Sequence, residues 1–392
     1  MPAEKRRIVL LGATGYTGRR VLRELLARGE APTLVGRNRA KMQTVADRLE
    51  ADLPVAEVDV TSTADLARLL DSSDVVLSTV GPFMQLGIAT ITAAAQAGAH
   101  YLDSTGEGGF VRRAFEQLDS VAAARGGTIV PAFGYDYVPG NLAGALALTR
   151  AGERARRIEI GYFLTRSGHG DQLRYRSTLR DTFTLSTGGT RATLVASAAD
   201  EAFAYRRPRP GSPAVLIDER AGKRVRSFDY AGVRRSGMTV GGSEHLGLPE
   251  AFPDLDSVDV YLGWLGRWTR ATQIISTLNA PLLRSAKVRA SLTPLSQRLP
   301  GSDREPDSDG RSLIIAVARD ASGAPLATTA LTGPDPYEMT ASLIAWGATR
   351  AAAPTAALTP GVHGPVTAFG LDTLRAGATE SGINEVDHPS GA

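Results

Sequence analysis

The stretch Arg-Ile-Val-Leu-Leu-Gly-Ala-Thr-Gly-Tyr-Thr-Gly at residues 7–18 is the part of the sequence that best indicates the fold. It opens with a continuous apolar run, residues 8–11, as expected of a parallel strand that is buried on both faces. Three glycines follow at intervals of three residues, Gly12, Gly15 and Gly18. They allow a sharp turn, a close approach of the backbone to a pyrophosphate, and tight packing of the next helix on the sheet. The pattern therefore predicts a dinucleotide-binding unit.

The segment after the glycines has the helical pattern that such a unit requires. Apolar residues at 21, 22, 25 and 26 share one face of a helix that begins near Tyr16. The start of that helix presents free N–H groups and the positive end of its dipole to phosphates. We therefore expect the cofactor phosphates to be held by Gly12, Thr14, Gly15, Tyr16, Thr17 and Gly18.

The residue after the second expected strand, 33–36, favours NADP over NAD. An NAD site usually has Asp or Glu about 20 residues after the glycines, where the carboxylate accepts hydrogen bonds from the ribose. Here that position holds Arg37, preceded by the small Gly36. A guanidinium can stack on adenine and donate to a 2′-phosphate as a bidentate fork. We therefore expect NADPH/NADP+ as the cofactor, bound through Arg37, Asn38 and Arg39.

Strands and helices continue to alternate up to about residue 133, which predicts a doubly wound Rossmann sheet. Further strands are expected over 55–60, 74–80, 100–103 and 128–131. Ligands of open parallel sheets bind beyond the carboxyl ends of the strands. Additional cofactor contacts are therefore expected from Asp59, Thr79, Val80, Gly81, Pro82 and Phe83.

Beyond residue 133 the pattern changes to a mixture of strands and helices. Helices are expected over 142–148 and 191–202, and a hairpin over 312–332. The fold class is therefore α/β, an N-terminal Rossmann doubly wound parallel sheet with a second mixed α+β domain. The expected parts are an NADP-binding Rossmann domain (1–133), an α+β substrate or dimerisation domain (134–336), a C-terminal helix and segment returning to the Rossmann domain (337–382), and a mobile tail (383–392).

Composition limits the classes of function. The 392 residues include 43% hydrophobic and 22% charged residues, as in a globular protein, and the net charge of +3 does not indicate nucleic-acid binding. The absence of Cys excludes disulfides and thiolate chemistry, and the five His show no metal-ligand spacing, so no metal is expected. The charged N-terminus leads directly into the first strand. We therefore expect no signal peptide, no transmembrane segment and a cytoplasmic protein.

Several short motifs lie at the ends of the expected elements. They are Gly-Ala-Thr-Gly-Tyr-Thr-Gly (12–18), Thr-Val-Gly-Pro-Phe (79–83), Tyr-Leu-Asp-Ser-Thr-Gly-Glu (101–107), Gly-Tyr-Asp-Tyr-Val-Pro (134–139), Thr-Gly-Gly-Thr (187–190) and Thr-Ala-Phe-Gly (367–370). In this order they resemble those of the saccharopine dehydrogenase-like NADP oxidoreductases, most closely the bacterial trans-acting enoyl reductase branch. The chain departs from that pattern at 138–141, where Val-Pro-Gly-Asn replaces Val-Pro-Ser-Asp, and at 364–367.

The resemblance implies a reductase that uses NADPH on an activated C=C bond, in lipid, polyketide or other secondary metabolism. The implied partner is a small-molecule or carrier-bound acyl substrate. Other relatives reduce imines of amino acids, so a reductase of Schiff bases is the alternative enzyme. A non-catalytic protein that senses NADP or acts as a scaffold is the alternative outside the enzymes.

Candidate catalytic residues follow the sixth expected strand. Hydride transfer needs a donor that protonates or polarises the acceptor. None of the ten Tyr has a Lys four residues later, which excludes the short-chain dehydrogenase arrangement. Tyr135, Asp136 and Tyr137 are the remaining candidates, with Tyr135 as the first choice for the proton donor; Asp136 is equally well explained as a cap or turn residue. Thr105 and Glu107, after the fifth strand, are assigned to the cofactor or to a turn.

Two other segments have alternative interpretations. The charged stretch 167–180 either lines the mouth of a site for an anionic acceptor or forms a solvated face. The apolar stretch 256–283 either packs within the protein, caps a lipophilic pocket, forms a homodimer or makes peripheral contact with a membrane. Arg267 and Arg270 interrupt it, so it is not expected to span a bilayer.

Overall fold

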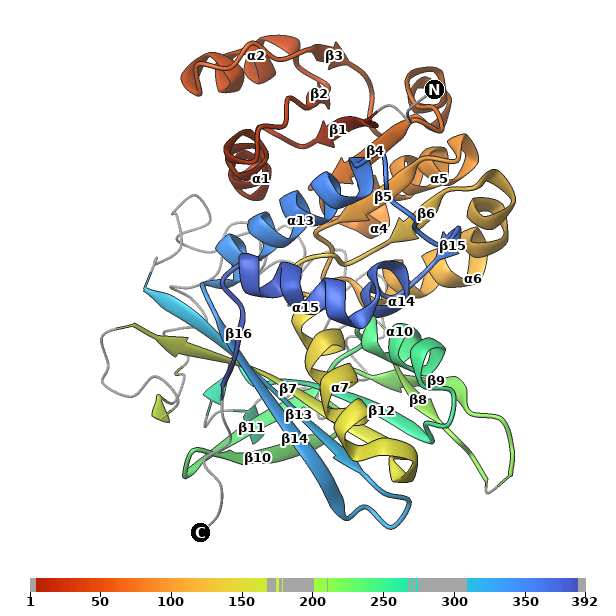
Figure 1. Ribbon diagram of the computed structural model, residues 1–392, viewed down its shortest axis with the longest axis vertical. Helices are drawn as coiled ribbons and strands as arrows, with labels where there is room; N and C mark the ends of the chain where they lie inside the picture. Colours follow the sequence, from red (N-terminus) through yellow and green to blue (C-terminus); the bar gives the residue numbers. More distant parts are fainter. Residues whose placement is uncertain are drawn as a thin grey trace. The chain divides into compact units, whose positions relative to one another are not determined.

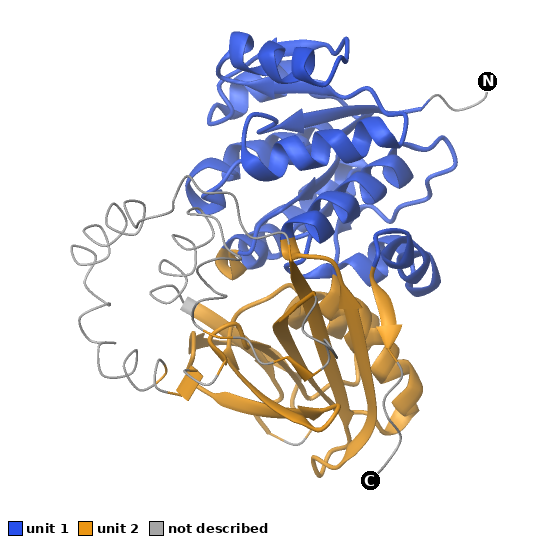
Figure 2. Cartoon of the chain, turned by 90° about the vertical axis from the view of Figure 1, so that its left-hand side faces the viewer, with its two compact units in different colours: residues 1–106, 110–138, 337–382 blue, residues 107–109, 139–336, 383–392 orange. Residues whose placement is uncertain are grey.

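The computed structural model describes residues 5–167, 174–175, 178, 201–209, 211–266, 269–270, 273 and 309–386. The chain divides into two compact units, coloured separately in Figure 2. Unit 1 comprises residues 1–106, 110–138 and 337–382, and unit 2 comprises residues 107–109, 139–336 and 383–392. The chain therefore leaves the first unit, builds the second, and returns to the first through residues 337–382.

A parallel sheet of seven strands forms the centre of unit 1 (Figure 1). Its strands are β1 (Arg7–Leu11), β2 (Thr33–Gly36), β3 (Val55–Glu57), β4 (Asp74–Ser78), β5 (His100–Asp103), β6 (Thr128–Val130) and β15 (Gly361–Val362). Their order across the sheet is β15-β6-β5-β4-β1-β2-β3, and every neighbouring pair is parallel. The order reverses direction at β1, next to β4, which is where open sheets of this type bind their ligand.

Helices between the strands complete the doubly wound arrangement. Apart from the first residues of α6 and α13, the helices of unit 1 are α1 (Tyr16–Ala27), α2 (Arg39–Arg48), α3 (Thr63–Leu69), α4 (Phe83–Leu86), α5 (Ile88–Ala97), α6 (Gly108–Arg125), α13 (Pro336–Ala352), α14 (Pro365–Phe369) and α15 (Leu371–Glu380). Helix α1 buries Val21, Leu22 and Leu25, the face that the sequence pattern predicts.

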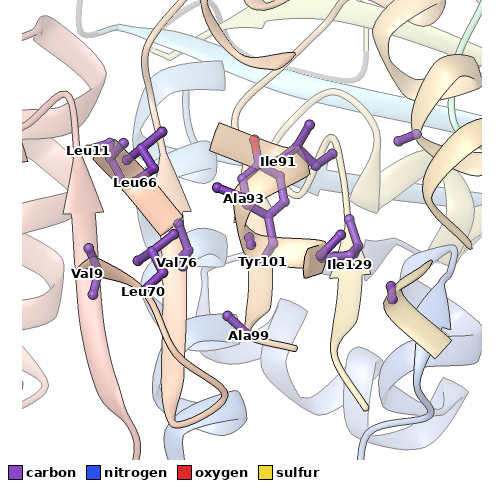
Figure 3. Packing of buried hydrophobic residues seen from close by; sticks show 14 of the residues in the cluster. Val9, Leu11, Leu66, Leu70, Val76, Ile91, Ala93, Ala99, Tyr101 and Ile129 are labelled. Atoms are coloured by element: carbon purple, nitrogen blue, oxygen red, sulfur yellow. The ribbon is translucent and has the colours of Figure 1, made fainter. Parts of the chain in front are cut away.

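Strand and helix side chains meet in one apolar cluster in unit 1 (Figure 3). Val9, Val76, Tyr101 and Ile129 come from neighbouring strands, and all four are fully buried. The labelled partners in Figure 3 from the helices and the strand ends include Leu11, Leu66, Leu70, Ile91, Ala93 and Ala99. Burial of such side chains contributes about 1.5–3 kcal/mol each and fixes the strand ends that carry the candidate site.

Unit 2 is built around a mixed sheet. Its elements are α7 (Val138–Ala151), a short 3-10 helix (Gly152–Arg154), β7 (Arg157–Arg166), β8 (Glu201–Arg206), β9 (Val215–Arg220), β10 (Val225–Tyr230), β11 (Val233–Thr239), α10 (Glu244–Ala251), β12 (Ser257–Leu262), β13 (Gly310–Arg319), β14 (Pro325–Gly333) and β16 (Asn384–Val386). Strand β12 pairs with β7 in parallel, while β13 pairs with both β7 and β14 in antiparallel fashion. The hairpin expected over 312–332 is confirmed, with Ser312 opposite Gly333.

Three expectations about local structure are wrong within the described residues. Strand β3 ends at Glu57 instead of running to residue 60, because Asp59 binds Thr61 and starts a turn. Residues 201–202, expected at the end of a helix, belong to strand β8; residues 191–200 lie outside the described residues. Asn384–Val386, expected in a mobile tail, form β16 against β14.

The apolar stretch 256–283 packs within the protein where it is described, which is the first of its expected alternatives. Its first part is strand β12, which lies inside the unit 2 sheet between β11 and β7. Tyr261 and Trp264 are each 4% exposed, so these side chains pack within the protein and do not form a surface for a membrane. Residues 274–283, and most of the charged stretch 167–180, lie outside the described residues.

Candidate cofactor and proton-transfer site

The glycine-rich turn between β1 and α1 has the shape of a phosphate cradle. Gly12 has a φ of +90°, which favours glycine, and its carbonyl accepts a hydrogen bond from the N–H of Gly15 at 2.9 Å. A Cβ on Gly18 would lie 2.0 Å from the Gly12 oxygen, so only glycine fits where the helix crosses the turn. Gly15 and Thr14, in contrast, are exposed. The turn thus packs tightly against the protein and leaves its outer face open to a ligand.

Thr79, at the end of β4, braces this turn. Its N–H and its Oγ1 donate to the carbonyl of Leu11 at 3.0 and 3.1 Å. A Cβ on Gly12 would lie 2.5 Å from Thr79 Oγ1 and 3.0 Å from a methyl group of Val80. The side chains of Thr79 and Val80, both expected to contact the cofactor, are therefore also part of the packing that shapes the glycine turn.

We expect the substitution Gly18→Ala to destabilise unit 1. The new methyl group cannot be accommodated without moving the β1–α1 turn, so the free energy of unfolding should fall by about 2 kcal/mol or more, with loss of NADPH binding. Gly109→Ala is the matched control, because a Cβ at Gly109 meets nothing within 4 Å. Urea unfolding of the two variants measures the difference; equal stabilities would show that the tight crossing at Gly18 is unimportant.

The segment after β2 presents an available cation. Arg37 is exposed, and within the described part of the chain no hydrogen bond to its guanidinium is found. Its neighbours are engaged differently: the Asn38 side chain caps helix α2 by accepting from the N–H of Lys41 at 2.8 Å, and Arg39 donates to the carbonyl of Val55 at 2.7 Å. Of the three residues expected to read the 2′-phosphate, Arg37 is the one whose side chain makes no hydrogen bond within the described residues.

Asp59 lies near Arg37 at the same edge of the sheet. Its Oδ1 accepts from the N–H and the hydroxyl of Thr61 at 2.9 and 2.7 Å. These two hydrogen bonds lower the pKa of Asp59, and the positive charge of Arg37 lowers it further. Asp59 is therefore an anion held in a turn near the Arg37 guanidinium.

The loop after β4 divides into an exposed part and a buried part. Gly81 and Pro82 are exposed, whereas Phe83 is 6% exposed and packs edge-on against Phe110 at 5.5 Å in the unit 1 core. The Phe83 ring is therefore part of the core packing, and the cofactor contact expected at this residue stays a prediction. Gly81 and Pro82 keep the position beyond a strand end that the sequence predicts.

Asp103, at the end of β5, joins the two loops that carry the remaining candidates. Its Oδ1 accepts from the N–H of Thr105 and from the N–H of Ala132, both at 2.9 Å. Its carbonyl oxygen accepts from the N–H of Phe133 at 2.7 Å. Ala132 has a φ of +58°, an unusual value for a residue with a side chain. The buried Asp103 carboxylate thus helps to hold a strained turn immediately before the candidate catalytic residues.

Asp136 and Tyr137 lie against the backbone of Gly106. A Cβ on Gly106 would lie 2.9 Å from Asp136 Oδ2, and the Tyr137 hydroxyl donates to the Gly106 carbonyl at 3.0 Å. Burial raises the pKa of Asp136 to about 7. Its side chain retains partial exposure, and no hydrogen bond to its carboxyl is found among the residues that the structure describes. A carboxylic acid in this state can donate a proton near neutral pH.

Tyr135, the first choice for the proton donor, occupies a different environment. It is 2% exposed and is among the largest fully buried side chains. Because Asp136 is partly exposed and Tyr135 is not, the geometry favours Asp136 for proton transfer. The other two expected residues are also buried: Thr105 is 0% exposed, and Glu107, which belongs to unit 2, is 9% exposed.

Other classes of site find no support in the described residues. There, no group of three or more His, Asp or Glu side chains is arranged to hold a metal ion. Among the described helices, none combines the length and the apolar character that crossing a membrane requires. The features that remain are the open glycine turn, the available guanidinium and the carboxyl group at the ends of the parallel strands.

Comparison with known proteins agrees with these features. Residues 8–130 match the family model of the saccharopine dehydrogenase NADP-binding domain. This part of the chain is similar to that NADP-binding domain. The saccharopine dehydrogenase-type domain covers β1 to β6, and its cofactor is NADPH/NADP+, as the sequence predicts. The turn that excludes side chains at Gly12 and Gly18, together with the guanidinium of Arg37, fits that cofactor.

Two similar curated proteins share only part of their length with this chain. A trans-acting enoyl reductase of Mycobacterium ulcerans is 35% identical over 140 residues, 34% of each chain. The trans-acting enoyl reductase of Mycobacterium leprae is 36% identical over 141 residues, again 34% of each chain. The matched segment is thus about a third of these relatives.

The fold as a whole resembles that of a solved structure. Apo saccharopine dehydrogenase (L-Glu forming) from Saccharomyces cerevisiae superposes with a TM-score of 0.59. The match covers 97% of this chain and 99% of that one at 13% sequence identity. At this identity the match shows the fold alone: a Rossmann-type α/β unit with a second mixed sheet, as the sequence predicts.

Proposed function

We propose that this protein is an NADPH-dependent reductase of an activated C=C bond. The observation that carries the proposal is the Asp136 carboxyl group, which lies near the ends of the strands of an NADP-binding sheet and is partly exposed. Burial raises the pKa of this carboxyl to about 7, so it can hold a proton near neutral pH. Reduction of a C=C bond conjugated to a carbonyl requires both a hydride and a proton. A NADP-binding domain alone explains only the first requirement.

The residues of this chain then have distinct tasks. The glycine turn and Arg37 hold the cofactor, which supplies the hydride when bound. Hydride addition to the β-carbon of the acceptor leaves negative charge on the enolate. Asp136 protonates the α-carbon, and the resulting carboxylate regains its proton from solvent. Asp103 and Tyr137 hold the loops at the ends of β5 and β6.

The substrate class follows from the named relatives. Proteins called trans-acting enoyl reductases are about 35% identical over the matched segment, which supports an acyl substrate bound to a carrier. In this proposal residues 134–336 bind that substrate or form a homodimer, and the protein works in the cytosol. Imine reduction is the second candidate, because the Asp136 carboxylic acid can equally protonate an imine nitrogen before hydride transfer.

An acceptor panel tests the proposal. Purified protein is mixed with NADPH and with enoyl thioesters, simple enones and cyclic imines, and the loss of reduced nicotinamide absorbance is followed. Oxidation with the C=C acceptors supports the proposal, and oxidation with the imines alone supports the second candidate. Tight NADPH binding without oxidation by any acceptor would favour a sensor or scaffold.

A further inference from the structure

Helix α13 reaches back from the C-terminal part of the chain to the loop that carries Asp136. Phe133 stacks parallel to Trp346 with ring centroids 6.3 Å apart, and a Cβ on Gly347 would lie 2.5 Å from the Phe133 ring. Six residues before Trp346 on the same helix, Thr340 meets the next residues of the loop. The loop therefore lies along the helix over several residues.

Thr340 contacts this loop in two ways. Its Oγ1 accepts a hydrogen bond from the N–H of Tyr135 at 3.0 Å, across 205 residues of sequence. A Cβ on Gly134 would lie 2.8 Å from the Thr340 methyl group and 2.9 Å from its hydroxyl oxygen. Only glycine at position 134 allows this approach, so the loop backbone is fixed immediately before Asp136.

The same helix also reaches the glycine-rich turn. Tyr337, one turn before Thr340, packs edge-on against Tyr16 at 5.2 Å with an interplanar angle of 89°. Arg20 donates from its guanidinium to the Tyr16 hydroxyl at 2.6 Å. Helix α13 thus contacts both the start of the phosphate-binding helix and the loop with the proton donor.

We propose that Thr340 is a positioning residue for Asp136: its hydroxyl oxygen, by holding the N–H of Tyr135, fixes the loop so that the Asp136 carboxyl stays against Gly106. This inference rests on the proposed function for its catalytic meaning. The placement of the carboxyl itself, however, is measurable without any acceptor.

The test compares three variants of the full-length protein. Thr340→Val keeps the shape of the side chain and removes the acceptor, Thr340→Ser keeps the acceptor, and Thr349→Val makes the same change on the same helix. Thr349 is a suitable control, because its buried hydroxyl has no partner among the described residues. The titration of Asp136 is followed by NMR of protein with 13C-labelled aspartate carboxyls, and Asp136→Asn identifies its signal.

The expected result is specific to the hydroxyl oxygen. Thr340→Val should lower the titration midpoint of Asp136 by about 1 pH unit or more, because the released carboxyl becomes better solvated. Thr340→Ser and Thr349→Val should leave it unchanged. With an acceptor, Thr340→Val should lower kcat by about 10-fold or more at constant NADPH affinity. If Thr340→Val does not fold, Thr340→Ala removes the same acceptor.

An unchanged Asp136 titration in Thr340→Val would overturn the inference, whatever the catalytic result. Failure of the proposed function has a different signature: no acceptor is reduced by the wild type, while the titration still responds to the loss of the Thr340 hydroxyl. The two failures are therefore distinguishable.

Discussion

Replacing Arg37 with alanine is expected to weaken NADPH binding by about 100-fold and to leave NADH binding nearly unchanged. The guanidinium is exposed and is not engaged by the described part of the chain, so the wild-type protein offers it to a ligand. Charge-assisted hydrogen bonds to a phosphate contribute about 1.5–3 kcal/mol, which corresponds to about 10- to 150-fold in affinity. NADH lacks the 2′-phosphate, so for NADH the substitution removes only the stacking of the guanidinium on adenine. Fluorescence titration of the two reduced cofactors measures both effects.

Arg39→Ala is the matched control for Arg37→Ala. Arg39 is only two residues away and carries the same charge, but it donates to the Val55 carbonyl. Removal of the Arg39 side chain should weaken NADPH binding by about 5-fold or less, because it removes only a positive charge at some distance from the 2′-phosphate. Equal losses for NADPH and NADH in Arg37→Ala, or a larger loss in Arg39→Ala, would assign the 2′-phosphate to another residue.

Replacing Asp136 with asparagine is expected to lower turnover by about 100-fold or more at unchanged NADPH affinity. A positioned general acid contributes about 100- to 10,000-fold, and asparagine cannot donate a proton of comparable acidity. In the wild type the active form is the protonated one. Because burial raises the pKa of Asp136 to about 7, kcat should be constant below that pH and fall about tenfold per pH unit above it. Asp136→Asn should lack this decline.

Tyr135→Phe distinguishes the two candidate donors. The sequence makes Tyr135 the first choice, but the side chain is 2% exposed. We therefore expect the turnover of Tyr135→Phe to differ from that of the wild type by about 3-fold or less. A loss of 100-fold in Tyr135→Phe, together with wild-type turnover in Asp136→Asn, would return the role of proton donor to the tyrosine.

The NADP-binding sheet could be predicted from the sequence because its signals are local. The apolar run of β1, the glycines that follow it and Arg37 lie within 31 residues of one another, at positions 7–37. The crossing at Gly18 shows that one steric reason for these glycines lies within the motif itself, since a Cβ there would lie 2.0 Å from the Gly12 oxygen. The types of these elements and their alternation along the chain follow from such local patterns.

The details of the candidate site could not be predicted, because they depend on burial and on long-range contacts. Tyr135 and Asp136 are neighbours in sequence, and only the folded chain distinguishes the buried side chain from the partly exposed one. Thr340 meets Tyr135 across 205 residues, and no local pattern marks it. Phe83 occupies the expected loop, yet its ring turns into the core toward Phe110.

A crystal structure with bound NADP+ would show directly whether Arg37 and the glycine turn hold the cofactor. We expect the pyrophosphate to lie on the turn at Gly15, the 2′-phosphate to accept hydrogen bonds from the Arg37 guanidinium, and the nicotinamide to lie at the strand ends that carry Asp136. A cofactor whose adenosine ribose faces away from Arg37, or an empty glycine turn at saturating NADP+, would contradict this expectation.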